Sequence, residues 1–331
     1  MTFKYNNVYI SDTATITGPY EGNGPLSKYF DKSYNDFYFN QKTWEQAESR
    51  LIEESVDLVL NKVGKTKFDI DLHISGDLLN QVAASNYAAA SIGIPYLGIY
   101  NACATSCEGL ILASNMIESS QINNAIVSVS SHNNGAEKQF RYPVEYGGPK
   151  PKTCTFTTTG AASAYLTNTK SSIRIESGTI GQVVDMGVKD AFNMGAVMAP
   201  AAARTIYQHL KDTKREIGYY DLILTGDLGR YGKKMLVEYM KSEYNIHLKN
   251  YEDSACLIFD DEQPVYAGAS GPACLPLVSY GLIFNKMRKK EFLRVLLVAT
   301  GALHSSSMVN QKLTIPSISH AVSVEVVLWY I

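Results

Sequence analysis

An internal repeat constrains the fold of this chain more than any other feature of its sequence. The segment Asp71–Leu78 reads DLHISGDL and Asp221–Leu228 reads DLILTGDL, so Asp, Leu, Gly, Asp and Leu recur at the same places. Both copies follow a long segment with helical spacing of apolar residues. A repeat of this kind predicts that the chain folds as two related units.

Two further correspondences occur in the same order along the chain. They pair 100–104 with 266–274 and 161–166 with 321–326. We therefore expect two βαβαβ-type halves, near residues 1–170 and 171–331. No linker rich in Pro, Ser or charge separates them, so we expect the halves to pack as one body.

Helix-like and strand-like segments alternate within each half. Thr43 and Gln46 form a capping box before a helix that ends at Gly64. The segment Phe68–Ile74 then has the pattern of an apolar strand, and another helix and strand follow as far as Tyr100. This alternation predicts an α/β fold in which helices cover a largely parallel sheet.

The composition excludes several classes of protein. Lys and Arg total 30 against 32 Asp and Glu in 331 residues, so no overall charge favours nucleic acid as a partner. The first residues are polar, and no later run approaches the roughly 18 apolar residues of a membrane-spanning helix. The five cysteines are scattered, which is typical of reduced thiols. We expect an intracellular protein with neither a signal peptide nor a transmembrane segment.

Cys103 is the strongest candidate for a functional residue. It lies between a strand expected over Tyr96–Asn101 and a helix expected over Ala104–Ile117. Functional sites of open α/β sheets lie at such carboxyl ends of strands. A helix N-terminus lowers the pKa of a cysteine and attracts anions, so we expect a site here. The alternative is a buried apolar cysteine, which is the default for Cys154 and Cys256.

Few histidines are placed to assist Cys103. His304 lies in the turn after the buried strand 295–300, where it could pair with Cys103 or cap a loop. His132 follows the other central strand, whereas His73 lies within a strand, where packing is the expected role. Cys103 and Cys107 lack further ligands nearby, and no acidic cluster resembles a calcium loop. We therefore expect no metal site and no cofactor.

Three connecting segments have compositions suited to binding. Gly268–Ala273 is a glycine-rich turn that contains Ser270 but matches neither a dinucleotide nor a phosphate-loop pattern. Phe140–Gly148 joins Arg141 to several aromatic rings, a combination suited to a planar anion or to a protein surface. Asp185–Gly195, which contains Asn193, has the length and composition of a lid or a dimer contact.

Taken together, these passages resemble the stage V sporulation protein AD family of spore-forming bacteria. The resemblance runs nearly end to end. It rests on ACATS at 102–106, SH at 131–132, EKQFR at 137–141, EYGG at 145–148, DAFNMG at 190–195, MAP at 198–200, IPS at 315–317 and HAV at 320–322.

The resemblance implies a thiolase-like fold, in which two duplicated halves form a five-layered α-β-α-β-α body. It also implies a function: a subunit without spanning helices, peripheral to the spore inner membrane, that binds dipicolinic acid (pyridine-2,6-dicarboxylate), free or as its calcium chelate. Its partners would be the integral membrane subunits of a channel complex that moves this ligand into the developing spore. The fold further implies a homodimer, which we expect to form through the strand Ala125–Ser130.

The same resemblance allows the enzyme hypothesis to be tested by residue. Condensing enzymes of this fold use a cysteine at the helix start, which Cys103 matches, together with His or Asn on two loops of the second half. The corresponding loops read GASG at 268–271 and GDLGR at 226–230, without histidine or the usual asparagine. We therefore expect no enzymatic activity.

Binding is the favoured hypothesis, and two alternatives remain. The expected ligand-binding residues are Cys103, Thr105, Ser106, Arg141, Asn193, Ser270 and His304. One alternative is a thiolase-type acyltransferase in which Cys103 and His304 are catalytic. The other is a structural interaction protein with a vestigial pocket.

Overall fold

Helices and strands alternate along the chain in the computed structural model, which describes residues 1–140 and 150–328. The strands are β1 Thr2–Lys4, β2 Tyr9–Thr17, β3 Lys32–Ser33, β4 Leu72–Gly76, β5 Tyr96–Gly98, β6 Asn124–Ser131, β7 Phe156–Thr157, β8 Gly160–Thr167, β9 Ile173–Ile180, β10 Leu222–Thr225, β11 Tyr251–Asp253, β12 Ala269–Ser270, β13 Arg294–Ala302 and β14 Ser317–Val326. The helices are α1 Pro19–Gly22, α2 Trp44–Val63, α3 Ala83–Ile92, α4 Thr105–Glu118, α5 Asn133–Phe140, α6 Met194–Thr213, α7 Gly229–Tyr244, α8 Cys274–Val278, α9 Phe284–Arg288 and α10 Ser306–Asn310.

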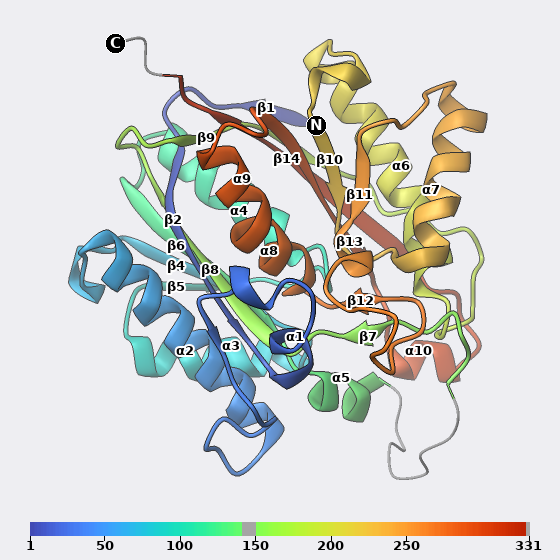
Figure 1. The fold of residues 1–331 in the computed structure, drawn as a ribbon, viewed down its shortest axis with the longest axis horizontal. Coiled ribbons are helices and arrows are strands. Elements are labelled where there is room, and N and C mark those ends of the chain that lie inside the picture. Colours follow the sequence, from blue (N-terminus) through green and yellow to red (C-terminus); the bar gives the residue numbers. More distant parts are fainter. Residues whose placement is uncertain (141–149, 329–331) are drawn as a thin grey trace.

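Within the described chain, the main sheet has twelve strands, of which ten form two sets of five with the same order, while β1 pairs with β9 and β3 with β2. One set runs β5-β4-β6-β8-β2 and the other β11-β10-β13-β14-β9 (Figure 1). In each set the first three strands are parallel and the remaining pairs are antiparallel. The sets meet where β2 pairs with β9. The duplicated α/β fold expected from the repeat is therefore confirmed; the assignment of 1–170 and 171–331 as separate units stays a prediction.

Three large hydrophobic cores among the described residues hold the layers of helices and strands together. The central core packs α4, α8 and α9 between the two strand sets, and includes Leu110 and Leu297. The outer cores pack α2 and α3 on one set, against Ile126, and α6 and α7 on the other, against Leu296. Successive residues of β13 thus point into different cores, which explains why this strand is apolar throughout. Each fully buried side chain of this size contributes about 1.5–3 kcal/mol of hydrophobic free energy.

The repeated segments form matching structures in the two halves. Helices α2 and α6, each of 20 residues, precede the two octapeptides, which form β4 and β10. The first aspartate of each copy, Asp71 or Asp221, accepts hydrogen bonds from two successive N–H groups at the start of β6 or β13. Each copy therefore ties its strand to the neighbouring strand at the same position.

The start of α2 confirms part of the expected capping box. Thr43 Oγ1 accepts a hydrogen bond from the Gln46 N–H at 3.3 Å, and Gly64 ends the helix with a φ of 63°. The Gln46 side chain, however, accepts from the Lys42 N–H rather than from Thr43. The strand expected from Phe68 is wrong at its start, because residues 67–69 form a 3₁₀ turn, Phe68 is 88% exposed, and β4 begins at Leu72.

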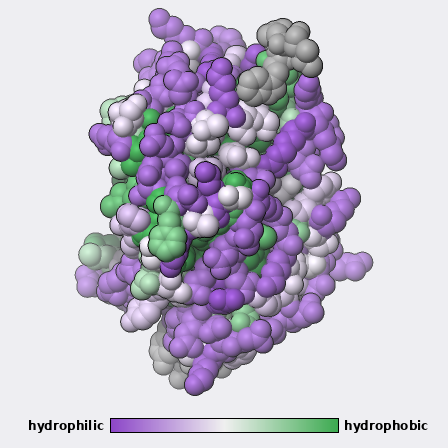
Figure 2. Space-filling view, turned by 90° about the vertical axis from the view of Figure 1, so that its left-hand side faces the viewer, coloured by the Kyte–Doolittle hydropathy of each residue, from purple (hydrophilic) through white to green (hydrophobic). Residues whose placement is uncertain are grey.

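The strand proposed for dimerisation is also wrong. Strand β6, which contains Ala125–Ser130, is paired with β4 on one side and β8 on the other. Its backbone groups are therefore already used within the chain. Within the described ranges, the edge of this half that lacks a partner strand belongs to β5, where Leu97 is 45% exposed. Seen from the left of Figure 1, the side where the sheet ends at β5, the surface carries a patch of apolar residues (Figure 2).

No helix in the described ranges is both long and apolar enough to cross a bilayer.

Candidate functional site

Cys103 lies at a tight elbow between β5 and α4. Strand β5 ends at Gly98, earlier than expected, and α4 begins at Thr105. Ala102 has a φ of 50°, in the left-handed region that non-glycine residues adopt at a cost of about 1–2 kcal/mol. A β-carbon added at Gly301 would lie 2.4 Å from the carbonyl oxygen of Asn101, so only glycine allows β13 to approach the elbow this closely. The local backbone therefore presents Cys103 where the two halves meet.

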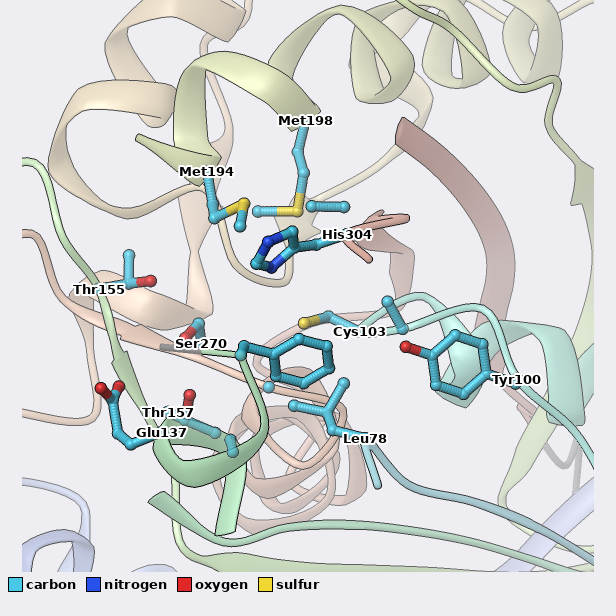
Figure 3. A pocket seen from close by; sticks show the side chains of 15 residues that line it. Leu78, Tyr100, Cys103, Glu137, Thr155, Thr157, Met194, Met198, Ser270 and His304 are labelled. Atoms are coloured by element: carbon cyan, nitrogen blue, oxygen red, sulfur yellow. The ribbon is translucent and has the colours of Figure 1, made fainter. Parts of the chain in front are cut away.

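A pocket of about 570 Å³ of empty volume, including the part open to solvent, surrounds Cys103. Its lining residues come from both halves: Leu78, Tyr100, Ala102, Cys103, Ala136, Glu137, Phe140, Thr155, Thr157, Met194, Met198, Ser270, Gly271, Ala302 and His304. In Figure 3, Met194 and Met198 lie beside His304 on one side, Leu78 and Tyr100 on the other, and the hydroxyl groups of Thr155, Thr157 and Ser270 gather at the far end. The pocket thus has apolar walls and a polar end.

Three of the expected site residues come together in this pocket. Cys103, Ser270 and His304 all line it, although they are up to two hundred residues apart in the chain. The His304 ring lies 5.3 Å from the Phe140 ring, with an interplanar angle of 31°. Ser270 is on β12, whose only partner in the described chain is β7.

Three other expected residues, Thr105, Ser106 and Asn193, are not among the residues that line the pocket. Thr105 is fully buried, and its hydroxyl donates to the Ala102 carbonyl at 2.7 Å while accepting from the Asn101 N–H. Ser106 is also buried. Asn193 caps α6, with its side chain accepting from Ala196 at 3.4 Å. Arg141 lies outside the described residues.

Several lining residues were not anticipated. Thr155 and Thr157 reach the pocket because β7 pairs with β12, a contact between segments over a hundred residues apart. Met194 and Met198 are spaced i,i+4 at the start of α6, and this periodicity is the one local signal that pointed to a shared face. Tyr100 and Leu78 follow the ends of β5 and β4.

The expected lowering of the pKa of Cys103 is wrong. Burial raises the pKa of the thiol well above its usual value, and the carboxyl group of Asp227 raises it further. The N–H groups of Gly271 and of Cys103 itself oppose these effects only in part. Desolvation therefore outweighs the helix N-terminus, and Cys103 is a neutral thiol at ordinary pH.

The buried histidines have structural roles. His132 Nε2 lies 2.8 Å from the Phe37 carbonyl, and His73 Nε2 lies 2.5 Å from Ser128 Oγ. Burial lowers the pKa of each of these two imidazoles to about 4. Among the described residues, His304 is the one imidazole that lines the pocket.

Charges around the pocket are largely paired. Glu137 lines the pocket and forms an ion pair with Lys150, whose Nζ lies 2.8 Å from Glu137 Oε2. In the described ranges, no group of three or more His, Cys, Asp and Glu side chains is arranged to hold a metal ion. The chemistry of the pocket is therefore that of hydroxyl groups, one imidazole, one thiol, the ion-paired carboxylate of Glu137 and backbone N–H groups.

Sequence comparison identifies the family. The sequence model of stage V sporulation protein AD matches residues 1–325. Stage V sporulation protein AD of Bacillus subtilis strain 168 is 46% identical over 319 residues, which cover 96% of this chain and 94% of that protein. The chain belongs to the stage V sporulation protein AD family. Membership of this family supports a role in sporulation, and the family name is not that of an enzyme.

Solved structures show the same fold in enzymes. 3-Oxoacyl-[acyl-carrier-protein] synthase III from Aquifex aeolicus VF5 matches with a TM-score of 0.59 at 13% identity, covering 96% of this chain and 99% of that one. Cerulenin-bound OleA from Xanthomonas campestris matches with a TM-score of 0.62 at 14% identity, covering 97% of this chain and 100% of that one. At these identities the likeness shows a thiolase-like fold and nothing of the activity.

Proposed function

We propose that the Cys103 pocket binds dipicolinate, free or as its calcium chelate, and that the protein does not transform it. The observation that carries this proposal is the pocket itself: two apolar walls converge on hydroxyl groups, an imidazole and a thiol that stays protonated. Dipicolinate is a flat ring with two carboxylates, so it requires apolar faces and a few local hydrogen-bond donors.

The walls suit a planar ring. Leu78, Phe140, Met194 and Met198 all line the pocket, and they are long, adaptable or aromatic side chains. His304 lies against Phe140 and presents an imidazole to the same space. A ring that enters this pocket would exchange water for contacts with these apolar side chains.

The donors suit carboxylates. Thr155, Thr157 and Ser270 offer hydroxyl groups. The backbone N–H groups of Cys103 and Gly271 point toward the Cys103 thiol and are further donors. Hydrogen bonds to a charged acceptor are worth about twice those between neutral groups. Calcium bound to the ligand would be carried mainly by the ligand's own oxygens.

Acyl transfer is the alternative favoured by a specific observation, the strained elbow at Ala102 that presents Cys103 as condensing enzymes present their nucleophile. Two features argue against it. Nucleophilic attack requires a thiolate, which burial and Asp227 oppose. The loop after β10 reads GDLGR at 226–230 and contains no histidine to transfer protons.

The proposed cellular role is that of a subunit in a channel complex at the spore inner membrane. Because the described helices include none that spans a bilayer, movement of the ligand across a membrane requires integral partner subunits. The protein would present dipicolinate to those partners.

Isothermal titration calorimetry with dipicolinate, with and without calcium, tests the proposal. We expect saturable binding at one site, weakened about tenfold or more, equivalent to about 1.4 kcal/mol, by Cys103→Ala and by His304→Ala. Matched controls are Cys256→Ala and His247→Ala, which remove the same groups outside the pocket. Undiminished binding by the two pocket variants would show that the site is wrong.

Two other results would select the alternatives. A covalent acyl adduct on Cys103 after incubation with acyl-CoA, detected by mass spectrometry, would establish the acyltransferase. Failure of the wild-type protein to bind dipicolinate at all would favour the structural interaction protein with a vestigial pocket.

A further inference from the structure

The elbow that presents Cys103 is strained, and its own hydrogen bonds are all local. Ala102 has a φ of 50°. The Thr105 hydroxyl joins the Asn101 N–H to the Ala102 carbonyl, and the Ala104 N–H donates to the Asn101 carbonyl at 3.0 Å. These bonds shape the elbow but would move with it. Strained backbone persists only where surrounding structure fixes it, so a contact from outside the elbow is required.

The side chain of Asn101 makes such a contact with the second half of the chain. Its amide group lies 3.3 Å from Nε2 of His320, a residue of β14 that is 219 positions away in the sequence. The imidazole is only 3% exposed. A hydrogen bond at this depth is protected from competition with water.

The His320 ring is itself held in place. Its Nδ1 accepts a hydrogen bond from the Gly181 N–H at 3.2 Å, just after β9. Burial lowers the pKa of His320 to about 4, so the imidazole is neutral at ordinary pH. Because Nδ1 is an acceptor, the one ring hydrogen is on Nε2, which faces the Asn101 amide group. Both ring nitrogens are therefore used, one toward the second half and one toward the elbow.

The same elbow residue also meets the backbone of the neighbouring strand. Gly301 of β13 approaches the Asn101 carbonyl so closely that an added β-carbon would lie 2.4 Å from its oxygen. Strand β14 pairs with β13, and His320 is opposite Ala299 in that register. Close packing by Gly301 limits how far the elbow can move toward the second half, whereas the His320 hydrogen bond keeps it from moving away.

We propose that His320 is a positioning residue of the Cys103 site, which holds the elbow in place through the side chain of Asn101. His320 does not line the pocket, so it acts on Cys103 only through the elbow. This inference goes beyond the proposed function and does not depend on the ligand. Its test uses the protein without dipicolinate, so a failure of calorimetric binding and a failure of this inference give different results.

The test is the rate at which iodoacetamide alkylates Cys103 at pH 9, followed for each cysteine by peptide mass spectrometry. The thiolate sulfur forms a bond to carbon and iodide leaves, so the rate reports how accessible the sulfur is at a fixed pH. His320→Leu removes both ring nitrogens and should raise the Cys103 rate about tenfold, the order of effect of losing one buried hydrogen bond. His320→Gln should restore the wild-type rate, because a side-chain amide also contains one acceptor and a donor.

The matched control is His209→Leu. His209 is another buried imidazole of the second half, with Nδ1 2.7 Å from Thr179 Oγ1 and Nε2 2.6 Å from the Tyr220 hydroxyl. This variant should lower the midpoint of thermal unfolding in the same way as His320→Leu but leave the Cys103 rate unchanged. All rates are compared well below the unfolding midpoint of each variant.

Asn101→Ala removes the same contact from the side of the elbow. It should raise the Cys103 rate as His320→Leu does, and the double variant should show no further rise, because both changes remove one interaction. An unchanged Cys103 rate in folded His320→Leu, or in Asn101→Ala if the first variant does not fold, would overturn the inference. An equal rise in His209→Leu would also overturn it, since general loosening of the second half would then explain the effect.

Discussion

The two copies of the octapeptide place an aspartate at the same position and use it differently. Asp77 accepts hydrogen bonds from the N–H groups of Leu79 and Ser85, each at 2.8 Å. Asp227 is fully buried, and neither of its side-chain oxygens accepts a comparable backbone hydrogen bond within the described residues. One carboxyl group holds a loop together, and the other is buried without an equivalent backbone contact.

The remainder of the repeat did not diverge in this way. Asp71 accepts from the N–H groups of Asn123 and Asn124, and Asp221 does the same for the start of β13. The comparison indicates that both copies keep the hydrogen bonds that join neighbouring strands. The second copy lacks the loop hydrogen bonds that Asp77 accepts in the first. Function is therefore to be sought where the halves differ.

The edges of the two strand sets differ as well, which leads to the largest expected effect. Leu97 of β5 is opposite Ile74, and Glu252 of β11 is opposite Leu224, the equivalent position. Glu252 forms an ion pair with Lys233, whereas Leu97 is exposed. We expect a homodimer through the β5 edge, and Leu97→Glu should convert it to a monomer in gel filtration with light scattering.

Leu313→Glu, which replaces another exposed leucine, should leave the dimer intact. A wild-type protein that elutes as a monomer would contradict pairing through β5.

The aspartates Asp77 and Asp227 should differ in their effect on stability. Asp77→Ala leaves two backbone N–H groups without acceptors, at a cost of about 1–3 kcal/mol for each that stays buried. Asp227→Ala removes an unpartnered carboxyl group, and should leave the free energy of unfolding unchanged or increase it. Urea denaturation measures both; equal losses in the two variants would show that Asp227 has a structural partner.

The first aspartates of the repeat should have equal effects. Asp71→Ala and Asp221→Ala each remove two hydrogen bonds at the protein surface. Each should lower the free energy of unfolding by about 1 kcal/mol, because water replaces part of what is lost. A large difference between them would contradict the equivalence of the two halves.

The smallest expected effect is the pH dependence of the difference between wild type and Asp227→Asn. An unfolded aspartate titrates near pH 4, and burial raises the pKa of Asp227 in the folded protein. Above about pH 4 the folded state thus retains a proton that the unfolded state has lost, so stability falls as pH rises. Asparagine does not titrate, so the variant does not lose stability in this way. The free energy of unfolding of Asp227→Asn, relative to that of the wild type, should therefore rise with pH from about 4 upwards. A difference that is constant with pH would indicate an ordinary carboxyl group.

Much of the fold was predictable because its signals are local or repeated. The octapeptides, the Thr43 cap and the Gly64 stop are adjacent in sequence to the structure they specify. The strand expected from Phe68 failed because apolar residues can form an exposed 3₁₀ turn as readily as a strand over so short a segment. The apolar pattern of β6 was also compatible with two paired edges, so it did not identify a dimer strand.

The site was predictable where a residue follows a strand or lies in a glycine-rich turn, as Ser270 does. Cys103 and His304 follow β5 and β13, and both line the pocket. Thr155 and Thr157 depend on the pairing of β7 with β12, which leaves no pattern in either segment. The raised pKa of Cys103 depends on Asp227, which is distant in sequence, and on burial, which the helix start does not reveal.

Protection of Cys103 by the ligand tests the central claim most directly. The wild-type protein would be alkylated at pH 9 with increasing dipicolinate, and each cysteine followed by mass spectrometry. We predict saturable protection of Cys103, with no change at Cys256, which is partly exposed but outside the pocket. Alkylation of Cys103 at an undiminished rate under dipicolinate concentrations that saturate calorimetric binding would contradict the account.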